Sequence, residues 1–165
     1  MNVQRILKHL FTPHWIISRT FPRAVLKRIG DEIGNSERYH DGEIRFAVEA
    51  GLHLVPLLKE VTPRQRAREV FSQLQVWDTE HNSGVLIYLQ LVDRRIEIVA
   101  DRGISAKVAQ AEWDAICRRM EAAFKKGEFE AGALKAIEEI TGLLGTHFPP
   151  IGDNPNELPD QPVIL

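Results

Sequence analysis

Acidic and amide side chains lie in short polar segments that separate the apolar runs of this sequence. Asp78, Asn82 and Asp101 fall in two such segments, and Glu43 opens an apolar run. Carboxylate, amide and backbone oxygens are the ligands that calcium and magnesium prefer in proteins. If the fold brings these segments together, they could hold a divalent cation, and such a cation could polarise a phosphoryl oxygen during hydrolysis.

The apolar periodicity predicts the strands that would position these side chains. Residues 43–50 alternate between apolar and polar side chains, which is typical of a strand buried on one face. Residues 85–92 are almost entirely apolar, as in a strand that is buried on both faces. Residues 95–100 alternate again, and the short connection at Asp93 and Arg94 predicts that they pair antiparallel with 85–92.

Helices are predicted between and after these strands. Apolar residues at helical spacing indicate helices over 22–37, 106–126 and 129–146. Another helix begins after Thr62, which is followed by a proline at the first helical position and by the glutamine of a capping box. The resulting order is helix, strand, helix, strand, strand, helix, helix, which is typical of an α/β fold.

This order brings the polar segments to one edge of a sheet. A strand–helix–strand unit normally forms a right-handed crossover between parallel strands, and the third strand is antiparallel to the second. The starts of the first two strands and the end of the third therefore share an edge, which we call the acidic rim. The residues expected on it are His40, Asp41, Glu43, Asp78, Glu80, His81, Asn82, Asp101 and Arg102. We expect a divalent cation site there, with Asp101 and Asp78 as leading ligands and with Glu43 and Asn82 beside them.

Turn formation is the alternative explanation for the same residues. Asp and Asn side chains often form hydrogen bonds with nearby backbone groups, and residues 41–42, 82–84 and 101–103 all resemble such turns.

The sequence signals for other catalytic chemistry are weaker. Cys117 lies within a predicted helix, where a thiol packs rather than reacts, and the sequence has no glycine-rich phosphate loop, HExxH helix or GxSxG elbow.

Composition limits the class of protein. The 165 residues are 44% hydrophobic and 27% charged, enough for one globular domain, and no apolar run approaches the roughly 20 residues of a membrane-spanning helix. The single cysteine excludes an internal disulfide and favours a reducing compartment. Since the start does not resemble an export signal, we expect a cytoplasmic protein.

The two ends of the chain differ from its middle. The first 30 residues contain six Lys or Arg and no acid, and residues 1–21 are predicted to be a basic helical segment that could contact an anionic membrane weakly. Five of the nine prolines lie within 149–165, which predicts an extended or disordered tail. The domain is therefore placed at 22–148, and we expect it to fold without residues 1–21. No nucleic-acid partner is expected.

The central motifs resemble those of the TPM domain family. The similarity includes residues 82–89, the hairpin at 93–95 and the run 96–104, and it covers about residues 24–148. Such a resemblance implies an α/β/α sandwich around a small mixed sheet. It also implies calcium or another divalent ion at loops on one sheet rim, bordered by residues 78–82 and 101–103, and a weak acid phosphatase activity in some members. Lacking an export signal and a membrane anchor, the chain resembles a soluble branch of this family.

Two classes of function follow from these observations. One is a cation-binding interaction or regulatory module that acts on an unidentified protein partner. The other is a weak metal-dependent acid phosphatase acting on a phosphorylated substrate. The sequence contains no obvious nucleophile with an orienting base, which favours the binding module.

Overall fold

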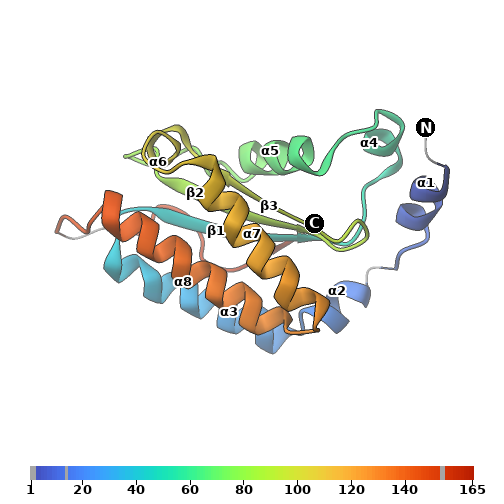
Figure 1. Ribbon diagram of the computed structural model, residues 1–165, viewed down its shortest axis with the longest axis horizontal. Helices are drawn as coiled ribbons and strands as arrows, with labels where there is room; N and C mark the ends of the chain where they lie inside the picture. The colour runs from blue at the N-terminus through green and yellow to red at the C-terminus, as the bar shows by residue number, and fades with distance from the viewer. Residues whose placement is uncertain (1–2, 14, 153–154) are drawn as a thin grey trace.

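A computed structural model describes residues 3–13, 15–152 and 155–165 of the chain (Figure 1). Within these residues the strands form one sheet in the order β3–β2–β1–β4. The strands are β1 (Glu43–Glu49), β2 (Gly84–Gln90), β3 (Arg95–Ala100) and β4 (Val163–Ile164). The helices are α1 (Val3–Leu10), α2 (Trp15–Thr20), α3 (Arg23–Ser36), α4 (Leu54–Leu58), α5 (Pro63–Gln73), α6 (Arg102–Ser105), α7 (Gln110–Lys125) and α8 (Phe129–His147), and a 3-10 turn, η1 (Glu37–Tyr39), follows α3.

The predicted pairing of the three central strands is confirmed. β1 and β2 are parallel, with Glu43 opposite Gly84, and β2 and β3 are antiparallel, with Val85 opposite Ala100. Helices α4 and α5 lie in the crossover between β1 and β2. The start of β1, the start of β2 and the end of β3 therefore meet at one edge of the sheet.

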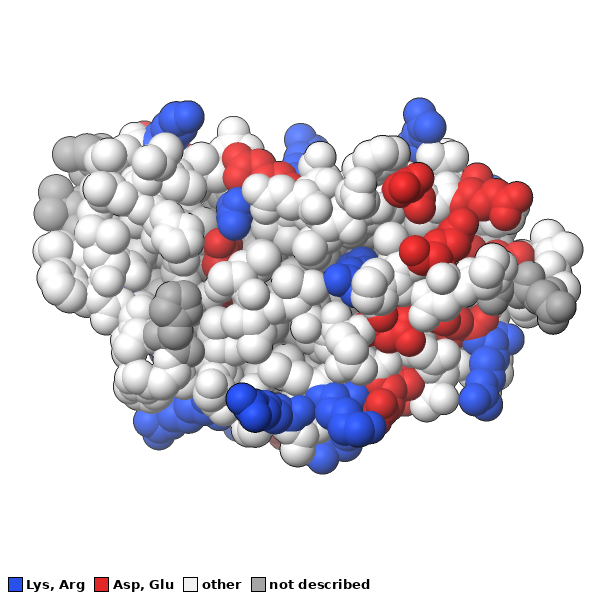
Figure 2. Space-filling model, turned by 180° about the vertical axis from the view of Figure 1, so that it is seen from behind, with Lys and Arg blue, Asp and Glu red and all other residues white. Residues whose placement is uncertain are grey.

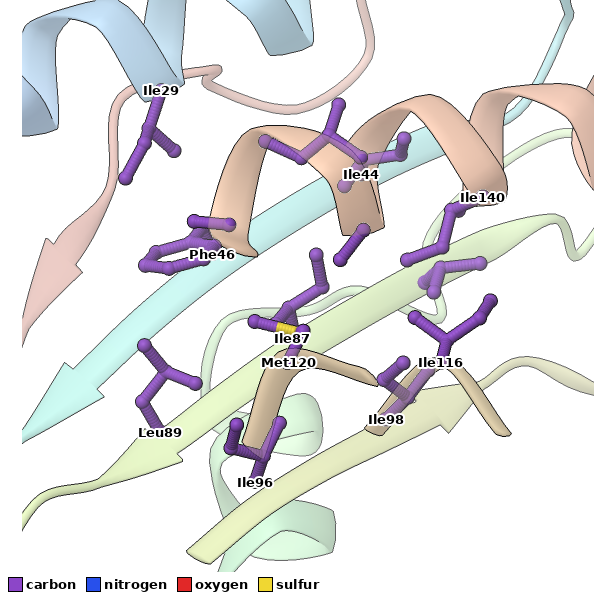
Figure 3. Packing of buried hydrophobic residues seen from close by; sticks show 14 of the residues in the cluster. Ile29, Ile44, Phe46, Ile87, Leu89, Ile96, Ile98, Ile116, Met120 and Ile140 are labelled. Atoms are coloured by element: carbon purple, nitrogen blue, oxygen red, sulfur yellow. The ribbon is translucent and has the colours of Figure 1, made fainter. Parts of the chain in front are cut away.

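Helices cover both faces of the sheet, so the fold is the predicted α/β/α sandwich (Figure 1). On one face, α3, α7 and α8 enclose the larger core cluster, and on the other face α5 covers a smaller one. Figure 3 shows the larger cluster, in which Phe46, Ile87 and Leu89 of the sheet face Met120 of α7 and Ile140 of α8. Burial of this apolar surface is the main driving force for the arrangement of the layers.

Strand β1 differs from the prediction of one-sided burial, because all seven of its residues are buried. Its polar residues find partners on the second face. Glu49 Oε1 lies 2.8 Å from Arg66 Nη2 of α5, and the hydroxyl of Tyr88 donates a hydrogen bond to Glu49. Alternation identified the two faces correctly, but paired charges allow the polar face to be buried as well.

The predicted helices are present, with one change near residue 105. The capping box at Thr62 is formed, since its side chain accepts a hydrogen bond from the Gln65 backbone N–H while the Gln65 side chain accepts one from the Thr62 N–H. The helix predicted over 106–126 is α7, which begins later, at Gln110, and the short α6 before it was not predicted. Asp101 caps the short α6, and Ala109, in an extended conformation, precedes α7.

The end of the predicted N-terminal segment lies in the core. Ile17 of α2 is 2% exposed and Phe21 is fully buried. The ring of Phe21 lies 6.0 Å from the rings of Phe46, Phe124 and Phe129. The packed domain thus includes α2, and a chain without residues 1–21 would lack part of the core.

The proline-rich segment 149–165 ends as the fourth strand of the sheet. Val163 and Ile164 of β4 pair in parallel with Ala47 and Val48 of β1. Leu158 is 8% exposed and joins the smaller core cluster. The segment thereby covers the edge of β1 that would otherwise present unpaired backbone groups. In the described parts of the chain, no helix has the length and apolar character required to cross a membrane.

Candidate functional site

The register of the sheet positions three of the predicted rim segments. Glu43 lies opposite Gly84, and the backbone N–H of Asp101 donates a 2.8 Å hydrogen bond to the carbonyl of Gly84. Glu43 on β1, Gly84 on β2 and Asp101 directly after β3 thus occupy neighbouring places at this edge of the sheet. Figure 2 shows that Asp and Glu side chains gather at the end of the molecule that holds this rim.

Glu43 is the most deeply buried of the predicted ligands, with 1% of its surface exposed. Its Oε1 accepts a 3.0 Å hydrogen bond from the backbone N–H of Glu157, whereas its Oε2 is buried and has no hydrogen-bond partner among the described residues. Burial raises the pKa of Glu43 to about 7, and the charges of Glu157 and Asp160 add to this effect, whereas the backbone N–H groups of Glu157 and Leu158 oppose it. The carboxyl is therefore divided between its protonated and ionised forms near neutral pH.

Further carboxylates surround Glu43, and we call Glu37, Glu43, Glu157 and Asp160 the C-terminal acidic cluster. Burial is the largest cause that raises the pKa of Glu37 to about 8, and the charge of Glu43, a side-chain hydrogen bond with Asp160 and the charge of Asp160 add to it. Glu37 Oε1 is buried and has no hydrogen-bond partner in the described structure. Arg45 is the neighbouring cation, and burial lowers its pKa.

Glu37, Glu157 and Asp160 were not among the predicted rim residues. Glu37 lies at the end of a predicted helix, and the other two belong to the segment predicted to be a tail. The signal in the sequence is weak. Leu158, Val163 and Leu165 are the apolar residues of the tail that reach the smaller core cluster, and their packing brings the neighbouring acidic residues to the rim.

Asp101 and Asn82 form the turn contacts that were considered as the alternative to cation binding. Asp101 Oδ1 accepts a 2.7 Å hydrogen bond from the Arg102 N–H at the start of α6, while its buried Oδ2 has no hydrogen-bond partner in the described parts of the chain. Asn82 has a φ of 52°, and its carbonyl accepts hydrogen bonds from the N–H groups of Gly103 and Ile104. Its side-chain Oδ1 accepts a 3.0 Å hydrogen bond from Arg102 Nε, which places a cation beside the predicted ligands.

Three more of the predicted rim residues differ in their exposure and contacts. Asp78 is exposed, and its backbone N–H donates to the carbonyl of Gln75. His40 is fully buried, its Nδ1 accepts a hydrogen bond from the Gly42 N–H, and burial lowers its pKa, which favours a neutral imidazole. His81 stacks on the ring of Phe148 with the ring centres 6.4 Å apart.

The loop before β2 separates Glu43 from Asp101. The register points both side chains to the face of the sheet covered by α5, on either side of Gly84. A Cβ atom added to Gly84 would lie 1.9 Å from the carbonyl oxygen of Val76, so loop backbone fills the space between the two acids. Accordingly, no group of three or more His, Cys, Asp or Glu side chains within the described residues is arranged to hold a metal ion.

One family model and two solved structures are similar to this chain. A family model for the TPM domain matches residues 18–143. The NMR structure of the BA42 protein from the psychrophilic bacterium Bizionia argentinensis is 30% identical, with a TM-score of 0.76 over 86% of this chain and 93% of that chain. The N-terminal domain of a protein from P. gingivalis, solved by NMR, shares the fold at 15% identity, with a TM-score of 0.62 over 86% of this chain and 95% of that chain. No curated protein matches the chain.

Proposed function

The chain belongs to the TPM domain family, and on that basis we propose that it is a divalent-cation-binding module whose acidic rim regulates an interaction with a partner protein. The observation that carries the proposal is the buried Oε2 of Glu43, which has no hydrogen-bond partner in the described structure. A buried carboxylate oxygen without a donor is costly, and it is relieved by a proton or by a cation.

The described side chains near Glu43 are not arranged around an ion as they stand, but carboxylates lie close enough to become further oxygen ligands after they turn. The C-terminal acidic cluster adds Glu37, Glu157 and Asp160 around a carboxylate that is fixed by its strand and by the Glu157 N–H. Glu43 would be the fixed ligand, and the other side chains would turn toward the ion. Backbone carbonyls and water would complete the six or more ligands typical of calcium.

This arrangement shifts the expected ligands away from the loop at residues 78–82. Asn82 Oδ1 already accepts a hydrogen bond from Arg102, and the loop backbone lies between Glu43 and Asp101. Asp101 keeps one buried oxygen without a hydrogen-bond partner in the described structure, so it remains a candidate for a separate, weaker contact. We therefore rank Glu43 first, Asp101 second, and Asp78 and Asn82 last.

Cation binding at Glu43 must be linked to protons. Because the pKa of Glu43 is about 7 and that of Glu37 is about 8, both carboxyls are partly protonated near neutral pH. A cation would displace those protons, so its affinity should increase as the pH rises through this range. Calcium and magnesium are the ions expected from an all-oxygen site.

An amide NMR titration with calcium, magnesium and zinc chlorides tests the proposal. We expect saturable shifts of residues 37–43 and 156–161 with calcium or magnesium, and their loss in Glu43→Gln. The matched control is Glu138→Gln, which removes an exposed carboxylate of α8 and should leave the titration unchanged. Shifts confined to 78–84 and 101–104 that disappear in Asp101→Asn would move the site to Asp101, and an absence of saturable shifts would refute cation binding.

The acid phosphatase alternative remains a prediction from the family resemblance. An activated nucleophile is not apparent at Cys117, because burial raises the pKa of its thiol to about 12. Hydrolysis of an aryl phosphate that disappears with a chelator and with Glu43→Gln would support a catalytic site at the same rim. The cytoplasmic location and the absence of a nucleic-acid partner also remain predictions.

A further inference from the structure

Large apolar side chains are exposed at the end of the molecule opposite the acidic rim. Eleven such side chains are exposed in the described part of the chain, and seven of them lie on α1, at its C-terminal end, at the start of α2 or on α4. We call these seven the N-terminal apolar patch: Leu7, Leu10, Phe11, Trp15, Leu54, Val55 and Leu58. Figure 1 shows α1 and α4 side by side at this end, and the two helices pack against each other.

The exposed residues of α1 form one face of the helix. Leu7, Leu10 and Phe11 are spaced by three and four residues, so their side chains point in one direction. His9 lies on another face and fixes the helix to the domain. It is 4% exposed, its Nδ1 accepts a 2.9 Å hydrogen bond from the Leu52 N–H, and its Nε2 lies 3.0 Å from Asp93 Oδ1. The helix is therefore held in place while its apolar face is left uncovered.

Helix α4 repeats this arrangement. Leu57 is 3% exposed and packs inward, whereas Leu54, Val55 and Leu58 point outward at the spacing of a helical face. Two short helices from separate parts of the chain thus present their apolar faces to solvent together. Contiguous exposed apolar surface of this kind marks a site of association with a protein or a membrane.

Exposed basic residues lie on the helices that carry the patch or next to them in sequence. Lys8 on α1, Arg19 on α2, Arg23 at the start of α3 and Lys59 after α4 are exposed, and the first acidic residue of the chain is Asp31. Glu60, the acid nearest to the patch in sequence, follows Lys59 directly. In Figure 2 this end of the molecule is largely uncharged with scattered Lys and Arg, whereas the acids concentrate at the opposite end.

We propose that the N-terminal apolar patch docks on the surface of an anionic bilayer. Apolar side chains on short helices flanked by Lys and Arg are suited to the interface between headgroups and acyl chains, where the exposed Trp15 would also be favourable. A lipid surface needs no shape complementarity, which suits a protruding patch of helix faces. Docking in this orientation would turn the acidic rim toward the solvent, where a cation or partner protein could reach it.

Sedimentation of the full chain with lipid vesicles tests this inference independently of cation binding. One vesicle set contains equal parts of phosphatidylcholine and phosphatidylglycerol, the other contains phosphatidylcholine alone, and both are used with a chelator present. We expect the chain to sediment with the anionic vesicles and to dissociate as the salt concentration rises, because few basic residues give only reversible, screened attraction.

Single substitutions test whether the patch, rather than another part of the surface, binds the vesicles. Phe11→Glu and Leu58→Glu place a carboxylate on α1 and on α4, and each should lower the vesicle partition coefficient by about ten-fold or more. Ile151→Glu is the matched control, because Ile151 is 76% exposed, close to the 79% of Phe11. Ile151 lies away from the patch, at the rim, where its backbone N–H donates a hydrogen bond to Asp41 Oδ2. It should bind as the wild type does, and circular dichroism would confirm that all three variants are folded.

Three outcomes would overturn the inference. They are the absence of binding to anionic vesicles, equal binding to both vesicle sets, and binding by folded Phe11→Glu that equals wild type. Sedimentation velocity without lipid adds a further discrimination. A dimer that Phe11→Glu dissociates would assign the patch to a second copy of this chain and would also refute the membrane proposal.

Discussion

Replacing Glu43 with glutamine should remove the pH dependence that this carboxyl imposes on stability. The pKa of Glu43 rises from its ordinary value of 4.5 to about 7 on folding, chiefly because the group is buried. Between these pH values the folded chain binds more protons than the unfolded chain, so the contribution of Glu43 to stability falls as the pH rises. Below about pH 4.5 the cost is absent, and above about pH 7 it is complete.

The size of the effect follows from the shift. At about 1.4 kcal/mol per pKa unit, a rise from 4.5 to about 7 corresponds to about 3 kcal/mol of destabilisation at alkaline pH. Glutamine avoids the cost of burying a charge but weakens the hydrogen bond from the Glu157 N–H, which is worth about 1 kcal/mol. We therefore expect Glu43→Gln to be more stable than wild type by about 1–2 kcal/mol near pH 8 and slightly less stable near pH 5.

Urea denaturation followed by circular dichroism at both pH values measures this change. Glu138→Gln again provides the control, since its exposed carboxylate should give the same small difference at both values. Equal effects of Glu43→Gln at the two pH values would refute the assignment of a buried, protonatable carboxyl. Calcium should stabilise the wild type near pH 8 and leave Glu43→Gln unaffected if the cation replaces the proton.

Two further predictions concern packing. Gly84→Ala should lower the free energy of unfolding by about 3 kcal/mol, because its Cβ would collide with the carbonyl oxygen of Val76. At Gly142 of α8 an added Cβ would have no atom within 4 Å, so Gly142→Ala should instead raise the free energy of unfolding by up to about 1 kcal/mol. Equal thermal melts for the two variants would contradict this reasoning. A chain that starts at residue 22 lacks Ile17 and Phe21, so its free energy of unfolding in urea denaturation should be lower by at least about 3 kcal/mol. A chain that starts at residue 15 keeps both residues. Equal urea midpoints for these two chains would contradict the placement of α2 in the core.

Local sequence patterns predicted the central fold. Alternation at 43–50 and 95–100 and the apolar run at 85–92 identified three strands, and the crossover rule gave their directions. The Thr62 capping box predicted a helix start because its hydrogen bonds join residues only three apart. Short-range signals failed where a short element has no periodicity of its own, as with α4 and α6.

The candidate site was predicted only in part. Topology placed Glu43 and Asp101 at a common edge, which the strand register confirms. It did not reveal that the loop backbone at Val76 lies between them, because that position depends on how α5 packs. Cys117 was expected to be a packing residue, and its side chain packs against the larger core cluster.

What the sequence by itself determined is the three central strands and the longer helices, the face that each of these strands turns toward the core, and the edge at which the polar segments meet. These features depend on periodicity, capping and chain handedness, which act over a few residues or over one crossover. Only the tertiary structure decided which acids surround Glu43, because Glu157 reaches it across 114 positions of sequence. The same docking of the C-terminal segment excludes water from Glu43 and raises its pKa, and burial of this kind depends on the packed chain as a whole.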